Sequence, residues 1–327
     1  MALRAALIGR LDNALTKNSN GQYRSGVRAF LNFLLETDNI AEHVEFPLNA
    51  VDAALYTSYL LKRHKPGSVR TYRSHLNFFC DMIGVARPAW NELPQMKRVF
   101  AQVNRMAKTT KKKLPITMAL AQDIVDACDM TSDTDRTCSF VLLLAIVGLF
   151  RLGELLVRKA TGIEQHKILR RDHVTFIPSI ANPTHMEIFL QYSKTDKFGV
   201  GCTIFIPCHP DVRYCPVRMM REIIQRLEKP TDPIFTWPSN DKFIATGAFI
   251  KWLRNKLHGL GIDDSRYAGH SCRRGGAITA KMAGASAPLI KALGRWTSEA
   301  FQIYLRLIPP RVEHLNDLLA AMMKMQG

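Results

Sequence analysis

The residues best suited to chemistry begin with an arginine that directly follows the longest apolar run of the chain, residues 140–150. Arg151 stands at the end of this run, and Glu154 follows three residues later. A charge beside buried apolar residues is costly unless a partner or an anion neutralises it. The spacing therefore indicates that Glu154 holds the Arg151 guanidinium, either as an ordinary helical ion pair or as the support of an anion site.

A lysine marks the second segment of interest. Lys194 lies in the polar, glycine-containing stretch 193–201, which separates two predicted strands and is typical of a hairpin tip. A lysine on such a turn is usually solvated, but an ammonium with a lowered pKa can donate a proton to a departing oxygen. Lys197 is a second candidate for the same role.

The third segment combines a histidine with two arginines. His270 and Arg273 are three residues apart, which places them on one face at the start of a predicted helix, and Arg274 and two glycines follow. The free N–H groups and the dipole at a helix N-terminus favour anions. Anion binding explains this combination better than packing does.

The fourth segment contains an aromatic pair, Trp296 and Tyr304. Trp296 is either a core residue or the source of an indole N–H for an oxyanion. Tyr304 is either an ordinary residue of an amphipathic helix or a nucleophile. Neither residue identifies a site by itself.

Taken together, these segments resemble the tyrosine recombinases, a family that includes phage integrases, bacterial chromosome-dimer resolvases and eukaryotic transposon enzymes. Residues 193–199, 270–277 and 294–304 are most similar to the Crypton, Ngaro and DIRS branch of eukaryotic mobile elements. The resemblance covers the catalytic half of the chain, and the N-terminal half looks like the core-binding domain of the family. One departure is that the stretch from Trp296 to Tyr304 is a residue shorter than in the bacterial relatives.

The resemblance implies a role for each polar residue at the scissile DNA phosphate. Arg151 and Arg273 would clamp its non-bridging oxygens, and Glu154 would support this arginine site. Lys194 would act as the general acid, and His270 would assist proton transfer. Two planar, permanently charged guanidinium groups would stabilise the phosphoryl oxygens of the transition state without a metal.

The aromatic residues complete the implied site. Tyr304 would attack the phosphate and form a 3′-phosphotyrosine, and Trp296 would hydrogen-bond the same phosphate at a place often held by a second histidine. Because the ester keeps the energy of the phosphodiester bond, the strand can be resealed without ATP. The implied activity is site-specific recombination or transposition, for integration or excision of a mobile element. A type IB topoisomerase and an inactive DNA-binding relative are the alternatives.

The sequence shows no P-loop, no cofactor fingerprint and no acidic two-metal cluster, so we expect neither a cofactor nor a metal. Its seven cysteines, an odd number, indicate free thiols in a reducing compartment. Cys202, Cys208, His209 and Cys215 are close in the sequence but lack the spacing of a zinc site.

The composition indicates a soluble globular protein that binds a polyanion. Of the 327 residues 47% are hydrophobic, and 45 lysines and arginines outnumber 28 acidic residues, for a net charge of +17. Because neutralised phosphates release counterions, double-stranded DNA is the expected partner. The apolar run is too short to cross a membrane, and we recognise no secretion signal. The expected location is the nucleus for a eukaryotic mobile element, and otherwise the cytoplasm or nucleoid.

The apolar periodicity divides the chain into a helical DNA-binding domain, residues 1–105, and a catalytic domain, residues 115–327, joined by a basic linker at 106–114. In the first domain the helices are expected to be interrupted at Asn18–Asn20 and at Pro66, with Ser68 as an N-cap. The helix after Pro66 is expected to present basic side chains, His75 among them, outward. Five basic residues are predicted to contact DNA phosphates: Arg70, Arg73, Lys111, Lys112 and Lys113.

The catalytic domain is predicted to be mainly helical with a small antiparallel sheet. Strands are expected at 174–177, 186–192 and 202–206, and helices at 117–129, 132–149, 216–228, 244–259, 273–284, 286–294, 298–307 and 312–325. The resemblance implies a two-domain, C-shaped clamp on DNA that works as a homo-tetramer. In that assembly the terminal helix packs either on its own domain or on a neighbouring protomer.

Overall fold

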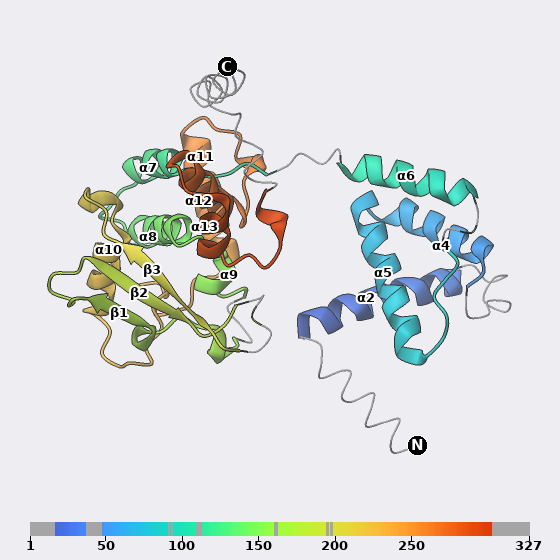
Figure 1. The fold of residues 1–327 in the computed structure, drawn as a ribbon, viewed down its shortest axis with the longest axis horizontal. Helices are drawn as coiled ribbons and strands as arrows, with labels where there is room; N and C mark the ends of the chain where they lie inside the picture. The colour runs from blue at the N-terminus through green and yellow to red at the C-terminus, as the bar shows by residue number, and fades with distance from the viewer. Residues whose placement is uncertain are drawn as a thin grey trace, which may run out of the picture. The chain divides into compact units, whose positions relative to one another are not determined.

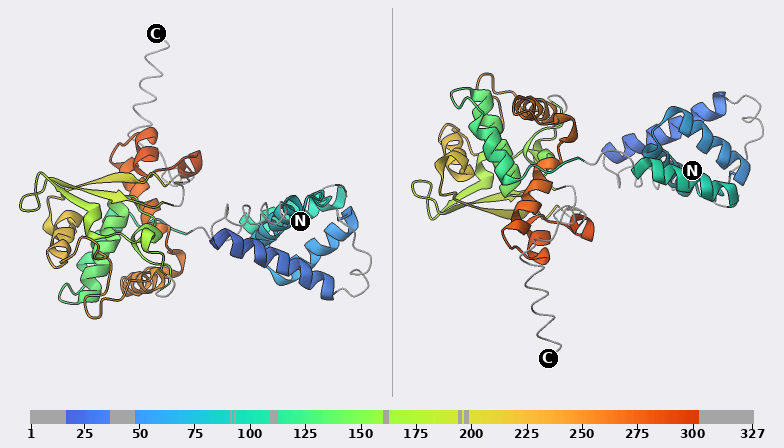
Figure 2. Two further views of the ribbon diagram at one scale, coloured as in Figure 1. Left: turned by 90° about the horizontal axis from the view of Figure 1, so that it is seen from below. Right: turned by 90° about the horizontal axis from the view of Figure 1, so that it is seen from above.

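The computed structural model describes residues 17–36, 48–90, 92, 94–108, 113–159, 163–193, 196 and 199–302. Its contacts divide the chain into two compact units, Met1–Lys111 and Lys112–Gly327 (Figures 1 and 2). Helix α6 (Pro94–Lys108) extends into the range that the sequence predicts as a linker.

The described residues of the N-terminal unit form α6 and three further helices, α2 (Lys17–Glu36), α4 (Ala50–Arg63) and α5 (Pro66–Ile83). Apolar side chains one helical turn apart fill its core, and Phe30, Phe33 and Tyr56 are almost fully buried. Local signals set the helix limits. The Asn49 side chain caps α4, and Gly84 ends α5 in the left-handed conformation, with a φ of 76°.

Two predicted boundaries in this unit are wrong. Asn18–Asn20, expected to interrupt the helices, lie inside α2. Helix α5 begins at Pro66, because a proline is well tolerated at the first helical position, where its missing N–H has no partner to lose. Ser68 therefore lies in the first turn of α5 and is not its N-cap.

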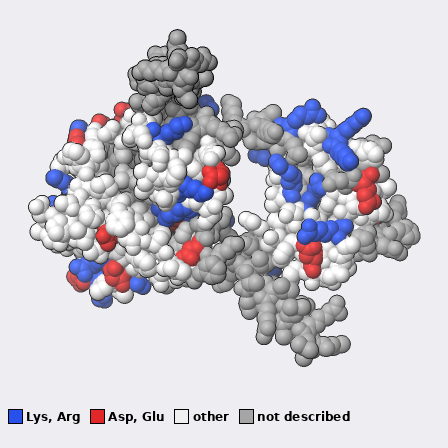
Figure 3. Space-filling view, viewed as in Figure 1, with Lys and Arg blue, Asp and Glu red and all other residues white. Residues whose placement is uncertain are grey.

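Two basic residues of α5 are packed against other side chains instead of facing solvent. His75 is 8% exposed, and the Arg73 guanidinium carbon lies 3.5 Å from the ring centroid of Phe100 and 4.5 Å from that of Trp90. Burial lowers the pKa of Arg73 to about 10. Arg73 thus contributes a cation–π contact to the unit, while Arg70 is exposed as predicted. Figure 3 shows further lysines and arginines on the visible face of this unit.

The C-terminal unit contains helices around one small sheet, so the predicted fold class is confirmed. The helices formed by its described residues are α7 (Met118–Asp126), α8 (Asp133–Val147), α9 (Leu152–Leu155), α10 (Pro216–Ile224), α11 (Thr246–Gly259), α12 (Ser271–Met282) and α13 (Ala287–Leu293). Of the helix expected at 298–307, the structure describes the part up to Gln302, with a 3-10 turn at Glu299–Phe301. The segment 312–325 lies outside the described residues.

The sheet joins β1 (Val174–Ile177), β2 (His185–Leu190) and β3 (Cys202–Pro207) in the antiparallel order β1-β2-β3. Alternate residues of β2 and β3 point into the core, and Ile188 lies opposite Ile204. The two strands therefore form the predicted hairpin.

Helix α8 lies at the centre of this unit (Figure 1). Every residue from Cys138 to Ile146 is buried, and α8 contacts α7, α10, α11 and α12. Two glycines allow α12 to approach closely. A Cβ on Gly276 would lie 2.2 Å from the carbonyl oxygen of Ile146, and one on Gly275 would lie 1.5 Å from that of Ile116. Packing, and not anion binding, thus explains the glycines of the third sequence segment.

In the part of the chain that the structure describes, none of the helices combines the length and the apolar composition that crossing a membrane requires.

Candidate active site

The turn between α8 and α9 presents the first predicted arginine. Leu149 adopts a φ of 48°, which is rare for a residue with a side chain, and Arg151 follows as the N-cap of α9. Nη1 of Arg151 donates to Oε1 of Glu154 at 2.7 Å and to Oγ of Ser193 at 3.1 Å. The backbone N–H of Arg151 donates to Oε2 of Glu154 at 2.9 Å. The expected Arg151–Glu154 pair is therefore present, and the β2–β3 hairpin contributes to it.

The Glu154 carboxylate is a shared partner of residues from four parts of the unit, three of which donate hydrogen bonds to it. Its side chain is 3% exposed. Besides Arg151 it accepts hydrogen bonds from Oγ of Ser193 at 3.1 Å and from Nη2 of Arg295 at 2.9 Å, and Nη1 of Arg273 lies 3.9 Å away. Burial by itself raises the pKa of Glu154, but the Arg295 charge and the contacts with Arg151 outweigh it, so this pKa lies below its ordinary value.

Arg273, in the first turn of α12, is 3% exposed. Its Nη1 donates to the carbonyl oxygen of Leu149 at 2.6 Å, and its Nη2 donates to that of Gly294. The guanidinium carbon lies 4.5 Å from the ring centroid of Trp296, and the Trp296 ring also stacks on Phe301, with the two centroids 5.5 Å apart. Trp296 therefore covers Arg273 with its ring face, and the hydrogen bond of its N–H to a phosphate stays a prediction.

His270 and Arg274, the other two basic residues of the third segment, have surroundings that differ from each other. His270 is the N-cap of α12 and is exposed. Arg274 instead donates to the carbonyl oxygen of Lys113 at 2.8 Å, and Nζ of Lys113 donates to the carbonyl oxygen of Ser265 at 2.6 Å. Lys113, predicted to contact DNA, thus belongs by its contacts to the C-terminal unit.

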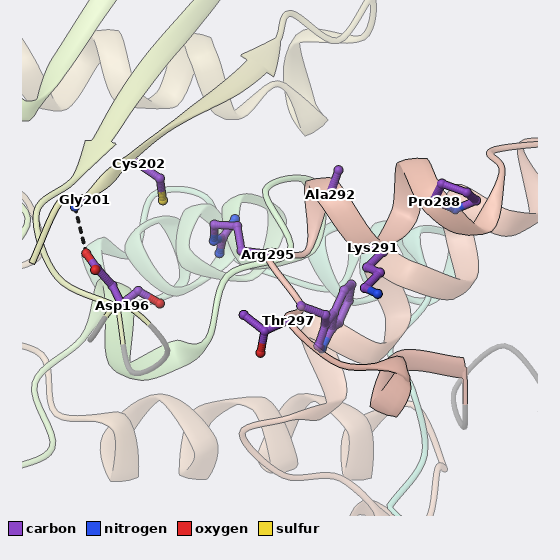
Figure 4. A pocket seen from close by; sticks show the side chains of 10 residues that line it. Asp196, Gly201, Cys202, Pro288, Lys291, Ala292, Arg295 and Thr297 are labelled. Carbon is purple, nitrogen blue, oxygen red and sulfur yellow. Dashed lines mark hydrogen bonds between the residues drawn. The ribbon is translucent and has the colours of Figure 1, made fainter. Parts of the chain in front are cut away.

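A pocket of about 490 Å³ lies beside this cluster (Figure 4). One wall is the β2–β3 hairpin, where Asp196 accepts the N–H of Gly201 at 2.7 Å, and the other wall is α13 with the residues that follow it. Ser193, Lys291 and Arg295 supply polar groups to its lining. Among the described residues no group of three or more histidine, cysteine or acidic side chains is placed to hold a metal.

The structure thus brings Arg151, Glu154, Arg273 and Trp296 into one cluster. Lys111, Lys112, Lys194, Lys197 and Tyr304 lie outside the described residues. Two members of the cluster were not predicted, Ser193 and Arg295. Their only signal in the sequence is that each adjoins a candidate, Lys194 in one case and Trp296 in the other.

No known protein-family model matches the chain. It is 26% identical over 211 residues to an integrase/recombinase xerD homolog from Selenomonas ruminantium, a match that covers 60% of this chain and 52% of that protein. The chain therefore spans about half the length of this curated relative.

Several solved structures with a similar fold are complexes with DNA. The XerH site-specific recombinase on its difH substrate has a TM-score of 0.63 at 11% identity, covering 92% of this chain and 79% of that one. The Tn1549 transposon integrase on transposon right-end DNA has a TM-score of 0.59 at 11% identity, and the match covers 99% of both chains. Lambda integrase bound to DNA has a TM-score of 0.51 at 14% identity, and the match covers 91% of this chain and 93% of that one. The chain has the fold of these recombinases and integrases.

Proposed function

We propose that this chain is a tyrosine recombinase that cuts and rejoins DNA through a 3′-phosphotyrosine at Tyr304, for integration or excision of a mobile element. The observation that carries the proposal is the convergence of Arg151 and Arg273 on one buried carboxylate, 2.7 and 3.9 Å from Glu154. Two guanidinium groups held this close to each other are suited to grip one phosphate.

In the proposed reaction the Tyr304 oxygen attacks the phosphorus, and the 5′-oxygen of the next nucleotide leaves. Negative charge then grows on the non-bridging oxygens, where Arg151 and Arg273 would donate hydrogen bonds. A single preorganised donor of this kind typically lowers the barrier by roughly 3–4 kcal/mol. Lys194 is proposed to protonate the departing oxygen, with His270 assisting from the start of α12.

The burial of Arg273 adds a step to this mechanism. Its two terminal nitrogens donate to the carbonyl oxygens of Leu149 and Gly294, and the Trp296 ring lies over the guanidinium. For Arg273 to reach a phosphate, the Gly294 carbonyl group and the Trp296 ring must turn away from its guanidinium. Binding of the DNA phosphate would have to supply the energy for this displacement.

The wider setting of this activity rests on resemblance and on charge. The net charge of +17 and the DNA complexes of the similar structures support double-stranded DNA as the partner. We propose a homo-tetramer on DNA, because exchange between two duplexes requires four strand cleavages. The Crypton, Ngaro and DIRS-like motifs at 193–199, 270–277 and 294–304 favour a eukaryotic mobile element, and hence a nuclear location.

The test uses a pool of duplexes with a randomised core and a nick, labelled at the 5′ end of the strand to be cut. Cleavage releases a short fragment at the nick, so the 3′-phosphotyrosine adduct accumulates, and denaturing gels should show the label in the protein band. Tyr304→Phe should abolish the adduct and leave gel-shift binding nearly unchanged. An adduct that persists in Tyr304→Phe refutes the nucleophile assignment.

The captured sequences then distinguish the alternatives. Two copies of the selected site on separate plasmids should recombine, whereas a type IB topoisomerase would relax a single plasmid without joining the two. An inactive DNA-binding relative would shift the pool in a native gel and form no adduct.

A further inference from the structure

Arg295 lies in the cluster around Glu154, although its type and spacing predicted no role. Its backbone adopts a φ of 53°, in the left-handed region that favours glycine, while the adjoining Gly294 has a φ of −81°. A non-glycine residue keeps such a conformation only where its surroundings hold it. Here the surroundings hold the conformation through the Arg295 side chain, which is 13% exposed and hydrogen-bonded to several groups.

The Arg295 guanidinium joins the end of α13 to the turn after α8. Its Nη1 donates to the carbonyl oxygen of Gly148 at 3.1 Å, and its Nη2 donates to that of Leu149 at 3.3 Å and to Oε2 of Glu154 at 2.9 Å. Leu149 also has a positive φ, and its carbonyl oxygen accepts from Arg273 as well. Two strained residues from distant parts of the sequence are thus held together by the same hydrogen bonds, directly beside Arg151.

The charges in this cluster explain why such a tie matters. Three guanidinium groups, those of Arg151, Arg273 and Arg295, surround the single carboxylate of Glu154. The excess of positive charge is suited to an anion, provided that the carboxylate does not neutralise the arginines that are to bind it. Arg295 donates to Oε2, the oxygen nearer to Arg273, which also accepts the backbone N–H of Arg151, while Oε1 accepts from the Arg151 side chain and Ser193.

We infer that Arg295 is a positioning residue for the two phosphate-binding arginines, an inference that rests on the proposed function. By holding Oε2 of Glu154 and the carbonyl oxygens of Gly148 and Leu149, it fixes the turn from which Arg151 projects. Without it, Oε2 of Glu154 keeps the backbone N–H of Arg151 as a donor but can shift towards Arg273, 3.9 Å away, and compete with the DNA phosphate for that arginine. Lysine cannot replace it, because one ammonium cannot reach three acceptors in the geometry of a planar fork.

The experiment compares the rate of covalent adduct formation and the gel-shift affinity of the full chain, on a site captured by the wild type. Arg295→Lys should slow adduct formation about 10- to 100-fold, as expected for a misplaced reacting group, and leave the affinity within about twofold. Arg295→Gln is measured in parallel. Thermal unfolding shows which of the two variants is folded, and one folded variant is sufficient for the comparison of rates. The matched control is Arg254→Lys. Arg254 is also half-buried and donates to a carbonyl oxygen, that of Tyr267 at 3.1 Å, and its replacement should change the rate less than about twofold.

A double-mutant cycle identifies the route of the effect. If Arg295 acts through Glu154, then adding Arg295→Lys to Glu154→Gln should slow adduct formation by less than about threefold, because the competing carboxylate is already gone. If Arg295→Lys slows adduct formation as much in the Glu154→Gln background as in the wild type, the inference is overturned. So does an equal loss in Arg254→Lys, or an unchanged rate in Arg295→Lys. Absence of an adduct in the wild type would instead overturn the proposed function, and this inference with it.

Discussion

Replacing Glu154 with glutamine tests whether its carboxylate holds the arginines together. The side chain is 3% exposed and accepts hydrogen bonds from Arg151, Ser193 and Arg295. Glutamine keeps the shape, but it removes the charge and turns one acceptor into a donor that faces other donors. Glu154→Gln therefore leaves buried guanidinium groups without their counter-charge.

The expected loss of stability follows from this burial. Removing one partner of a buried ion pair typically costs about 3–5 kcal/mol. Because the Arg151 side chain is 18% exposed and partly solvated, we expect the lower end of this range, about 3 kcal/mol at pH 7. For a unit of this size that loss lowers the unfolding midpoint by about 6–12 °C.

The difference in stability between the wild type and Glu154→Gln should depend on pH in a defined direction. The pKa of Glu154 is depressed in the folded state from its ordinary value of 4.5. The carboxylate therefore stabilises the fold fully above pH 4.5, and this contribution is lost as the pH falls through the depressed pKa. The difference in unfolding midpoint between the wild type and Glu154→Gln should thus be constant near neutrality and become smaller below pH 4.5.

Differential scanning calorimetry of the full chain at neutral and acid pH measures both effects. The matched control is Glu164→Gln in the same unit, where the carboxylate is 44% exposed and pairs with Lys167. An exposed pair contributes about 0–1 kcal/mol, so its midpoint should move by no more than about 2–4 °C. Equal midpoints for the two variants at pH 7 would refute the view that Glu154 neutralises the cluster.

Two further predictions concern packing and DNA contact. Arg70→Ala should flatten the dependence of DNA affinity on salt by about one unit of slope, whereas Arg73→Ala should leave the slope unchanged and destabilise the N-terminal unit by about 1–2 kcal/mol. Gel shifts at several salt concentrations and thermal unfolding separate these outcomes, and a slope that changes with Arg73 would contradict them. Gly275→Ala should destabilise the C-terminal unit by about 3 kcal/mol or more, because its Cβ would meet the Ile116 backbone at 1.5 Å. Gly153→Ala, with nothing within 4 Å, should change the unfolding midpoint little, and equal midpoints for the two glycine variants would contradict the packing argument.

The sequence predicts those elements in which apolar side chains follow one another without interruption or recur at a regular spacing. The wholly apolar run before Arg151 becomes the buried helix α8, and the alternating residues of β2 and β3 become a hairpin. The Arg151–Glu154 pair was also predictable, because its partners lie three residues apart on one chain segment. These features depend on neighbours in the sequence, or on one repeating face.

The missed features depend on contacts between segments that are far apart. Nothing near Arg73 in the sequence indicates that Trp90 and Phe100 enclose its guanidinium. Arg295 likewise reaches Gly148 and Glu154, which precede it by more than half of the C-terminal unit. Charged residues of this kind are assigned to the surface by default, and only the fold identifies their partners.

The geometry of Arg295 also bears on the one departure from the bacterial relatives. Counted from Trp296, the stretch to Tyr304 is one residue shorter than theirs, but counted from Arg295 it has their length. The structure assigns the two residues different contacts, since the Trp296 ring lies over Arg273 while the Arg295 side chain turns towards Glu154. The spacing by itself therefore does not distinguish the two residues, whereas their contacts do, because the Trp296 ring covers Arg273 and the Arg295 side chain supports Glu154.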